Sequence, residues 1–136
     1  MIFFNNESPE IDLPFDVPTF AQSVCRHLKV AIEHLELTFL TPNEMQSMNK
    51  KHLNHDYPTD TISFPLSSEP SLAGDIYICP KVVQENATAF TSSFEKELKI
   101  VIIHSILHLT GVTDDTASNF KNMKQLQDQI YSDLNL

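Results

Sequence analysis

Residues 94–114 decide the fold of this chain, and they read FEKELKIVIIHSILHLTGVTD. Between Ile100 and Leu109, apolar side chains occur almost all the way round the helix that this pattern predicts, which is typical of a helix enclosed by the rest of a protein. The predicted helix runs from Phe94 to Leu109, and Gly111 just past its end supplies a left-handed stop. We therefore expect a central helix around which the remaining elements pack.

Two histidines interrupt this apolar surface. His104 and His108 are four residues apart, so their side chains share one helical face with Cβ atoms about 5–6 Å apart. Both imidazoles can therefore reach one metal ion. The alternative is a metal-free core in which backbone groups or aspartate side chains satisfy both rings, because an unsatisfied buried polar group costs about 1–3 kcal/mol.

The residues after the helix add a third donor. From His104 the chain reads H-x-x-x-H-x-x-G-x-x-D, in which Gly111 turns the chain and Asp114 swings back toward the histidines, as the third ligand does in metzincin-type sites. Two histidines and one carboxylate with an open fourth position form a catalytic zinc arrangement that also suits ferrous iron. We predict that His104, His108 and Asp114 hold one Zn²⁺ ion or another divalent transition metal.

Apolar periodicity and turn residues predict the rest of the secondary structure. Thr41, Pro42 and Glu44 belong to a capping box that starts a helix of about three turns. The other helices are expected at residues 19–33, from 80 to about 90, and at 116–134, and the strands at residues 1–6, 35–40, 59–65 and 74–79. This order predicts an α/β (α+β) fold, in which a mixed four-stranded sheet packs with about five helices and the central helix carries the histidine pair.

Two further groups of residues are expected in the core. The last predicted helix carries an apolar stripe that should face the interior rather than a partner, formed by Phe120, Met123, Leu126, Ile130 and Leu134. Cys25 and Cys79 are isolated cysteines without C-x-x-C spacing, so neither a disulfide framework nor a cysteine-based zinc site is indicated. We expect both to be buried free thiols.

Length and composition place the chain among single-domain globular proteins. It has 136 residues, of which 41% are apolar and 20% charged, so we expect one domain spanning residues 1–136 and no extensive disorder. The longest apolar runs fall far short of the roughly 20 residues that cross a bilayer, so no membrane span is expected. The first 25 residues contain no Lys or Arg, so we expect no secretory signal and a cytoplasmic location.

The chain is strongly acidic. Its formal net charge of −9 repels polyanions at long range and slows nonspecific capture of nucleic acid. Any contact with RNA must therefore be local or assisted. The charge would also favour a basic protein partner, although an acidic surface commonly serves only solubility.

Three motifs in the chain resemble those of the YbeY family. HSILHLTGVTDD at residues 104–115 resembles the family's metal-binding signature, NKKHLNHDYPTDTISFP at 49–65 resembles the stretch around its T-D-V-L-S-F core, and GDIYI at 74–78 resembles its G-D-I strand. The resemblance implies a metal-dependent, single-strand-specific endoribonuclease that matures small-subunit (16S-type) ribosomal RNA and takes part in ribosome quality control. The implied partners are ribosomal RNA and the small ribosomal subunit or its proteins.

Two positions depart from the family pattern. Asp114 stands where the family has its third metal-binding histidine, and Leu53 stands where it has an arginine. A carboxylate in place of an imidazole lowers the charge of the metal centre by one, and leucine has no donor for a phosphate. Four nearby side chains can either supply a cation or simply form solvated surface, namely Lys50, Lys51, His52 and His55.

Two aspartates and one serine bear on the chemistry. The resemblance implies that Asp75 and Asp60 lie near the metal, where Asp75 is a candidate catalytic residue and either can serve as a general base or orient a ligand. Hydrogen bonding at strand ends is an equally good account of both. Ser105 follows His104 at the position where H-E-x-x-H zinc proteases carry their glutamate, so peptide hydrolysis is disfavoured.

The sequence leaves three functions open. The first is a metal-dependent endoribonuclease acting in ribosomal RNA maturation. The second is a non-catalytic ribosome-assembly module with the same fold, which Leu53, Asp114 and the acidic charge make credible. The third is a small metal hydrolase with a different substrate.

Overall fold

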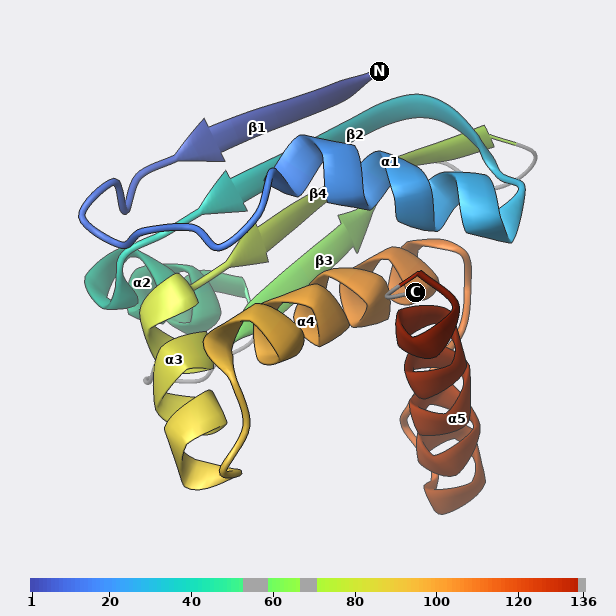
Figure 1. Cartoon of the computed structure of the whole chain (residues 1–136). Coiled ribbons are helices and arrows are strands. Elements are labelled where there is room, and N and C mark those ends of the chain that lie inside the picture. Colours follow the sequence, from blue (N-terminus) through green and yellow to red (C-terminus); the bar gives the residue numbers. More distant parts are fainter. Residues whose placement is uncertain (53–58, 67–70, 135–136) are drawn as a thin grey trace.

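Four strands form one mixed sheet in the order β1-β2-β4-β3 (Figure 1). The structure is a computed structural model that describes residues 1–52, 59–66 and 71–134. Three of the strands are parallel neighbours, β1 (Ile2–Asn6), β2 (Ala31–Phe39) and β4 (Ser71–Ile78). The last strand, β3 (Thr61–Pro65), runs antiparallel to β4 at the edge of the sheet. The predicted mixed four-stranded sheet is thus confirmed.

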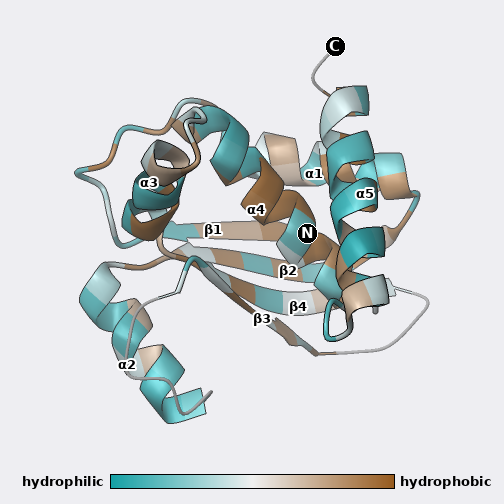
Figure 2. Ribbon diagram, turned by 90° about the horizontal axis from the view of Figure 1, so that it is seen from below, coloured by the Kyte–Doolittle hydropathy of each residue, from teal (hydrophilic) through white to brown (hydrophobic). Residues whose placement is uncertain are grey.

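Helices cover one face of this sheet. The described ranges contain α1 (Val17–Leu28), α2 (Pro42–His52), α3 (Pro80–Ala89), α4 (Phe94–Leu109) and α5 (Ala117–Leu134). Figures 1 and 2 show α1 and α4 on the same face of the sheet, with α3 and α5 on either side of α4, while α2 lies apart at the end of the sheet. Within the described ranges, no helix has both the length and the apolar character that a membrane crossing requires.

The central position predicted for α4 is confirmed. Four of its side chains are completely buried in the main core, Leu98, Ile102, Ile103 and Ile106, and Figure 2 shows the middle of the helix as strongly hydrophobic. The side-chain oxygen of Ser93 accepts a hydrogen bond from the Lys96 N–H at 3.1 Å and so caps the helix. Gly111 follows its end with a φ of 99°, a left-handed value that glycine adopts without strain.

The boundary between α1 and β2 differs from the prediction. The helix ends at Leu28 rather than near residue 33, and β2 begins at Ala31 rather than at residue 35. Lys29 adopts the left-handed conformation, with φ of 58° and ψ of 38°, and its N–H bonds back to the carbonyl of Arg26. Ile32, which the periodicity assigned to the helix, instead pairs with Leu72 of β4. The extra strand residues gain sheet hydrogen bonds that periodicity within a single segment does not reveal.

The capping box at the start of α2 is confirmed. The Thr41 N–H donates to Oε1 of Glu44 at 3.0 Å, and the Glu44 N–H donates to Oγ1 of Thr41 at 3.3 Å. Met45 in the first turn belongs to a second, smaller core cluster with Leu40, Ile62 and Cys79. Through this cluster α2 is attached to the edge of the sheet that carries β3.

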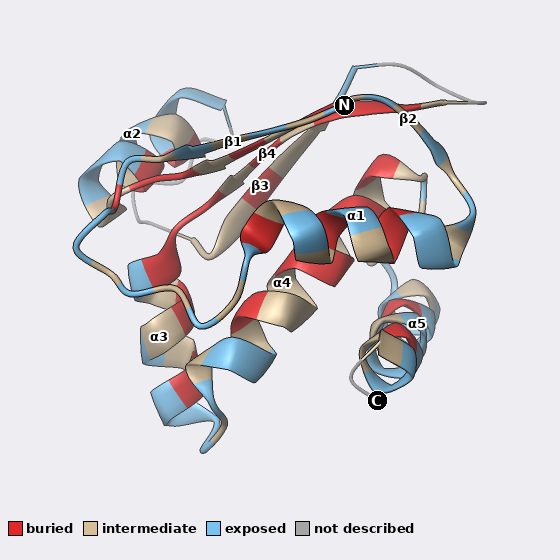
Figure 3. Ribbon diagram, turned by 45° about the horizontal axis from the view of Figure 1, so that its top comes forward, coloured by how far each residue is buried: buried red, intermediate tan, exposed pale blue. Residues whose placement is uncertain are grey.

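The apolar stripe predicted on α5 is only partly in the core. Met123 and Ile130 are buried, but Phe120 is 58% exposed and Leu126 is 37% exposed. Figure 3 shows α5 with exposed residues along most of its length, because this helix packs beside α4 and α1 rather than beneath the sheet. The expectation that the whole stripe faces the interior was therefore wrong for Phe120 and Leu126.

Both cysteines are buried free thiols, as predicted. Cys25 belongs to the main core and Cys79 to the smaller one. Burial raises the pKa of the Cys25 thiol to about 11 and also raises the pKa of Cys79. Both side chains are therefore neutral thiols at physiological pH.

Candidate metal centre

Three donor atoms converge at the C-terminal end of α4. Nε2 of His104 lies 3.0 Å from Nε2 of His108, and Oδ2 of Asp114 lies 3.5 Å from each of these nitrogens. Around a tetrahedral ion with metal–ligand distances near 2.0–2.2 Å, neighbouring donors stand about 3.3–3.6 Å apart. The two separations that involve Asp114 match that range, and the separation between the two imidazole nitrogens is slightly shorter, so the residues present fit a transition metal.

Local structure explains how Asp114 reaches the histidines. One turn of α4 separates His104 from His108, and their ring centroids lie 4.5 Å apart. Beyond the helix, the Gly111 N–H donates to the carbonyl of His108, and the Val112 N–H donates to the carbonyl of Leu107. These bonds reverse the chain within a few residues, and the carboxylate of Asp114 then lies near Nε2 of both histidines.

Gln127 of α5 orients His104, a role that the sequence pattern does not predict. Its Oε1 lies 3.0 Å from Nδ1 of His104. A ring N–H at Nδ1 can donate to this amide oxygen, which leaves the lone pair of Nε2 directed at Asp114 and His108. Such partners fix the tautomer and orientation of metal-binding histidines. The available sequence signal was weak: Gln127 lies one helical turn beyond the buried Met123.

The centre is half-buried and open on one side. The side chains of His104, His108 and Asp114 are 24%, 29% and 34% exposed. The histidines thus line the surface of the apolar core rather than its interior. This exposure leaves room for a water molecule or a substrate oxygen beside the three donors.

A cavity of about 890 Å³ adjoins His104 between α3, α4 and α5. Asp60, which immediately precedes β3, lines it together with Lys96, Lys124 and Phe120. Burial raises the pKa of the Asp60 carboxyl, while a hydrogen bond from the Thr61 N–H and the nearby His104 act in the opposite direction. Asp60 therefore lines the same cavity as His104.

Asp75 lies on the other face of the sheet. Its neighbour Gly74 faces α4 so closely that an added Cβ would lie 2.6 Å from Cδ2 of Leu109. Because side chains alternate along a strand, Asp75 points away from α4, beside Glu36 on β2 and Phe64 on β3. The structure does not bring Asp75 to the metal centre.

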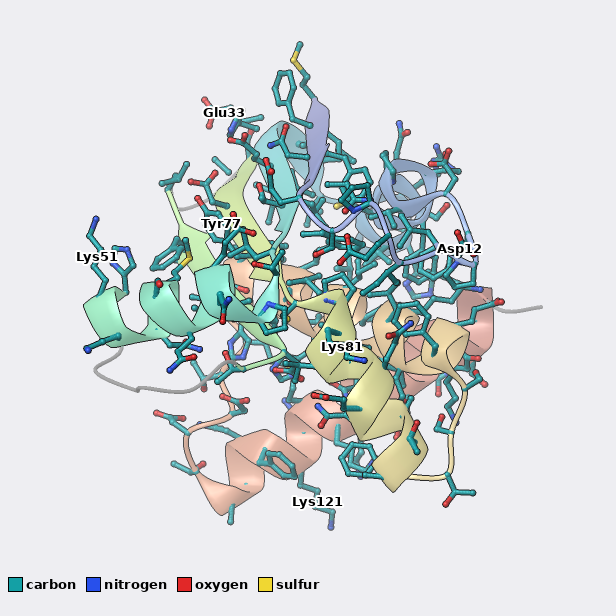
Figure 4. All side chains as sticks on the ribbon, turned by 90° about the vertical axis from the view of Figure 1, so that its left-hand side faces the viewer. Asp12, Glu33, Lys51, Tyr77, Lys81 and Lys121 are labelled. Atoms are coloured by element: carbon teal, nitrogen blue, oxygen red, sulfur yellow. The ribbon has the colours of Figure 1, made fainter. Side chains whose placement is uncertain are left out.

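The remaining residues of interest lie elsewhere. Ser105 is buried and its Oγ donates to the carbonyl of Val101 at 2.8 Å, with Oγ1 of Thr61 also at 2.8 Å, so it ties α4 to β3. Lys51 points outward from α2 into solvent (Figure 4), and Lys50 and His52 are exposed on the same helix. Leu53 and His55 fall outside the described residues.

Comparisons with known proteins identify a family for this chain. The family model described as endoribonuclease YbeY matches residues 3–135. Proteins named endoribonuclease YbeY include one from Chlorobium luteolum, 44% identical over 64% of this chain and 64% of its own length, and one from Chloroherpeton thalassium, 41% identical over 74% and 72%.

Some of these matches span less than two thirds of the relative, as with the Chlorobium protein. The solution structure of TM1509 from Thermotoga maritima is similar over 99% of this chain and 92% of its own, with a TM-score of 0.65 and 27% identity. The match of the family model over nearly the whole chain shows that this protein belongs to the endoribonuclease YbeY family.

Proposed function

We propose that this chain is a metal-dependent endoribonuclease that cleaves single-stranded RNA. Its role is the maturation of small-subunit ribosomal RNA and the quality control of ribosomes, in the cytoplasm. The observation that carries the proposal is the convergence of His104, His108 and Asp114, whose donor atoms lie 3.0–3.5 Å apart. Membership of the endoribonuclease YbeY family supports the choice of RNA as substrate.

His104, His108 and Asp114 would hold the metal, with Zn²⁺ as the first choice. When bound, the ion supplies Lewis-acid activation of a water molecule or of a phosphodiester oxygen. The carboxylate of Asp114 makes the centre less positive by one charge than three imidazoles would, so attraction for phosphate is weaker. Gln127 keeps the Nε2 lone pair of His104 directed into the centre.

The adjoining cavity suits a single strand better than a duplex. Phe90 and Phe120 line it and are 66% and 58% exposed, so their rings are available to stack on unpaired bases. Lys96 and Lys124 line the same cavity and can approach phosphates. Asp60, whose pKa is raised by burial, is placed to accept a proton during cleavage.

A non-catalytic ribosome-assembly module is the second candidate function. Asp114 in the ligand set and the formal charge of −9 both weaken binding of RNA phosphates. In this case the partners would be the same, ribosomal RNA and the small subunit or its proteins, but the chain would bind without cutting.

One assay separates these two functions. A single-stranded RNA and a matched duplex are incubated with the wild-type chain and with His104→Ala, each with and without a chelator. We expect cleavage of the single strand alone, abolished by the chelator and by the substitution. If the wild-type chain never cuts but a variant carrying Leu53→Arg and Asp114→His does, the non-catalytic function is supported and the enzymatic one fails.

A further inference from the structure

A second group of metal-ligand side chains lies on the sheet face that points away from α4. It consists of His34 and Glu36 on β2 and Asp75 on β4, and their donor atoms all lie within 4.8 Å of one another. Nε2 of His34 is 3.8 Å from Oε2 of Glu36 and 4.0 Å from Oδ1 of Asp75. No other triad of this kind besides the α4 centre occurs among the residues that the structure describes.

Sheet geometry holds the three side chains together. His34 and Glu36 are two residues apart on one strand and therefore share a face. Asp75 pairs directly with Glu36 in the parallel register between β2 and β4. Because β2 lies between β1 and β4, and β4 lies between β2 and β3, both strands that carry the group are paired on both sides, although the β2–β4 register is irregular between Ile32 and His34.

Neighbouring residues orient Glu36 and His34. The Asn5 side-chain amide donates to Oε1 of Glu36 at 2.9 Å, which leaves Oε2 on the side of His34. The ring of Phe3 packs against His34 with centroids 5.5 Å apart. These contacts from β1 restrict the side chains in the way that outer partners restrict metal ligands.

Asp75 supplies an oxygen that has no hydrogen-bond partner among the residues that the structure describes. Its Oδ1 is buried from water and accepts no hydrogen bond from any residue that the structure describes. Such an oxygen is costly unless a donor or a cation satisfies it. The distances to His34 and between His34 and Glu36 exceed hydrogen-bond length, so direct hydrogen bonds to the imidazole do not account for the arrangement.

The local charge also favours a cation. Two carboxylates face one imidazole, and their negative charge adds to desolvation in raising the pKa of the nearby Tyr77. An imidazole with two carboxylates is a donor set for first-row divalent ions, with zinc foremost, rather than for magnesium or calcium.

We propose that His34, Glu36 and Asp75 form a second cation site, which takes Zn²⁺ or a similar first-row divalent ion and ties β2 to β4 across the outer face of the sheet. The site is independent of the proposed ribonuclease function, because it lies on the opposite face from His104 and His108. Metal bound here stabilises the sheet without entering the catalytic centre.

Zinc titration of the metal-free chain by calorimetry tests the proposal. We expect two equivalents for the wild-type chain, one for His34→Ala, and one for a variant with both His104→Ala and His108→Ala. His27→Ala is the matched control: His27 pairs with Asp133 at 2.9 Å and belongs to no metal-ligand group among the described residues, so this variant should still bind two equivalents.

Glu36→Gln provides a second variant that preserves folding, since its amide oxygen can still accept from Asn5. It should weaken the second binding event by at least about tenfold, because loss of outer partners alone costs metal sites about 10–100-fold. A single equivalent in the wild-type chain would overturn the proposal. Binding of two zinc equivalents by His34→Ala would also overturn it, as would an unchanged affinity of Glu36→Gln for the second equivalent. If the chain shows no ribonuclease activity, these binding results are unaffected, because that outcome concerns only the α4 centre.

Discussion

Oε1 of Gln127 lies 3.0 Å from Nδ1 of His104, although the two residues belong to different helices and are 23 positions apart. The packing of α5 against α4 thus sets the direction of a ligand that α4 carries. Gln127→Ala should weaken metal binding by about 10–100-fold with little loss of helix content, because the imidazole loses the acceptor that fixes its tautomer.

Competition with a chromophoric chelator measures this affinity. Gln125→Ala on the exposed side of the same helix is the control and should bind as the wild type does. Equal affinities in Gln127→Ala and the wild type would show that the hydrogen bond does not orient the ring.

Gly74 is expected to be essential for the packing of α4 on the sheet. A Cβ at this position would lie 2.6 and 2.9 Å from the two Cδ atoms of Leu109 and 3.0 Å from the backbone oxygen of Phe64. Gly74→Ala should therefore destabilise the fold by about 1–3 kcal/mol, measured by urea denaturation. In a Leu109→Ala background the penalty should be smaller, because the clashing side chain is gone. An equal penalty in both backgrounds would assign the cost to something other than Leu109.

The two cysteines should resist modification in the folded protein. The pKa of Cys25 is raised to about 11 and that of Cys79 is also raised, so the reactive thiolate is scarce at pH 8, and both side chains are buried. Iodoacetamide followed by mass spectrometry should find no label under native conditions and two labels after unfolding in urea. Fast labelling of the native chain at either position would contradict the burial of that thiol.

Asp16 should make the stability of the chain depend on pH in the acid range. Its side chain accepts from the Thr19 N–H at 2.9 Å as the N-cap of α1, and this bond lowers the pKa of the carboxyl. Because the pKa of Asp16 is lower in the folded chain, its ionised carboxyl stabilises the fold at pH values above 3.8, the ordinary pKa of an aspartate. This stabilisation is lost as the pH falls through the lower pKa of the folded state.

Asp16→Asn can still cap the helix but carries no ionisable group. Denaturation curves between pH 7 and pH 2 should therefore show a smaller acid loss for Asp16→Asn than for the wild type. Asp12→Asn, at an exposed position before the same helix, is the control for a general change in charge. Parallel curves for Asp16→Asn and the wild type would show that the cap does not contribute to the acid response.

The sequence predicted α4 and the α2 cap well because their signals are local. Both ends of α4 were predicted correctly, since a largely apolar run is followed by Gly111. The end of α1 was not, because the left-handed turn occurs at Lys29, a residue with no preference for that conformation. The position of this turn is set by the pairing of β2 with β4. A pattern within one segment of the sequence does not reveal that pairing.

The same distinction applies to the candidate site. The spacing of His104, His108 and Asp114 is a local pattern, and the structure brings the three side chains together. The positions of Gln127 and Asp75 depend on tertiary structure. Helix packing brings Gln127 to the α4 centre, and strand register places Asp75 on the opposite face of the sheet. Resemblance to a motif cannot tell on which side of a sheet an aspartate points.

The turn at Gly111 divides the ligands of the α4 centre into two groups. The histidines are fixed to the most deeply packed helix, whereas Asp114 is carried on a short tether that leaves the helix at Thr110. Uptake and release of the ion should therefore begin with the carboxylate swinging in or out, while the imidazoles stay in place. The motion of that tether then sets the exchange rate of the metal. Metal exchange can therefore be fast although the core opens very rarely.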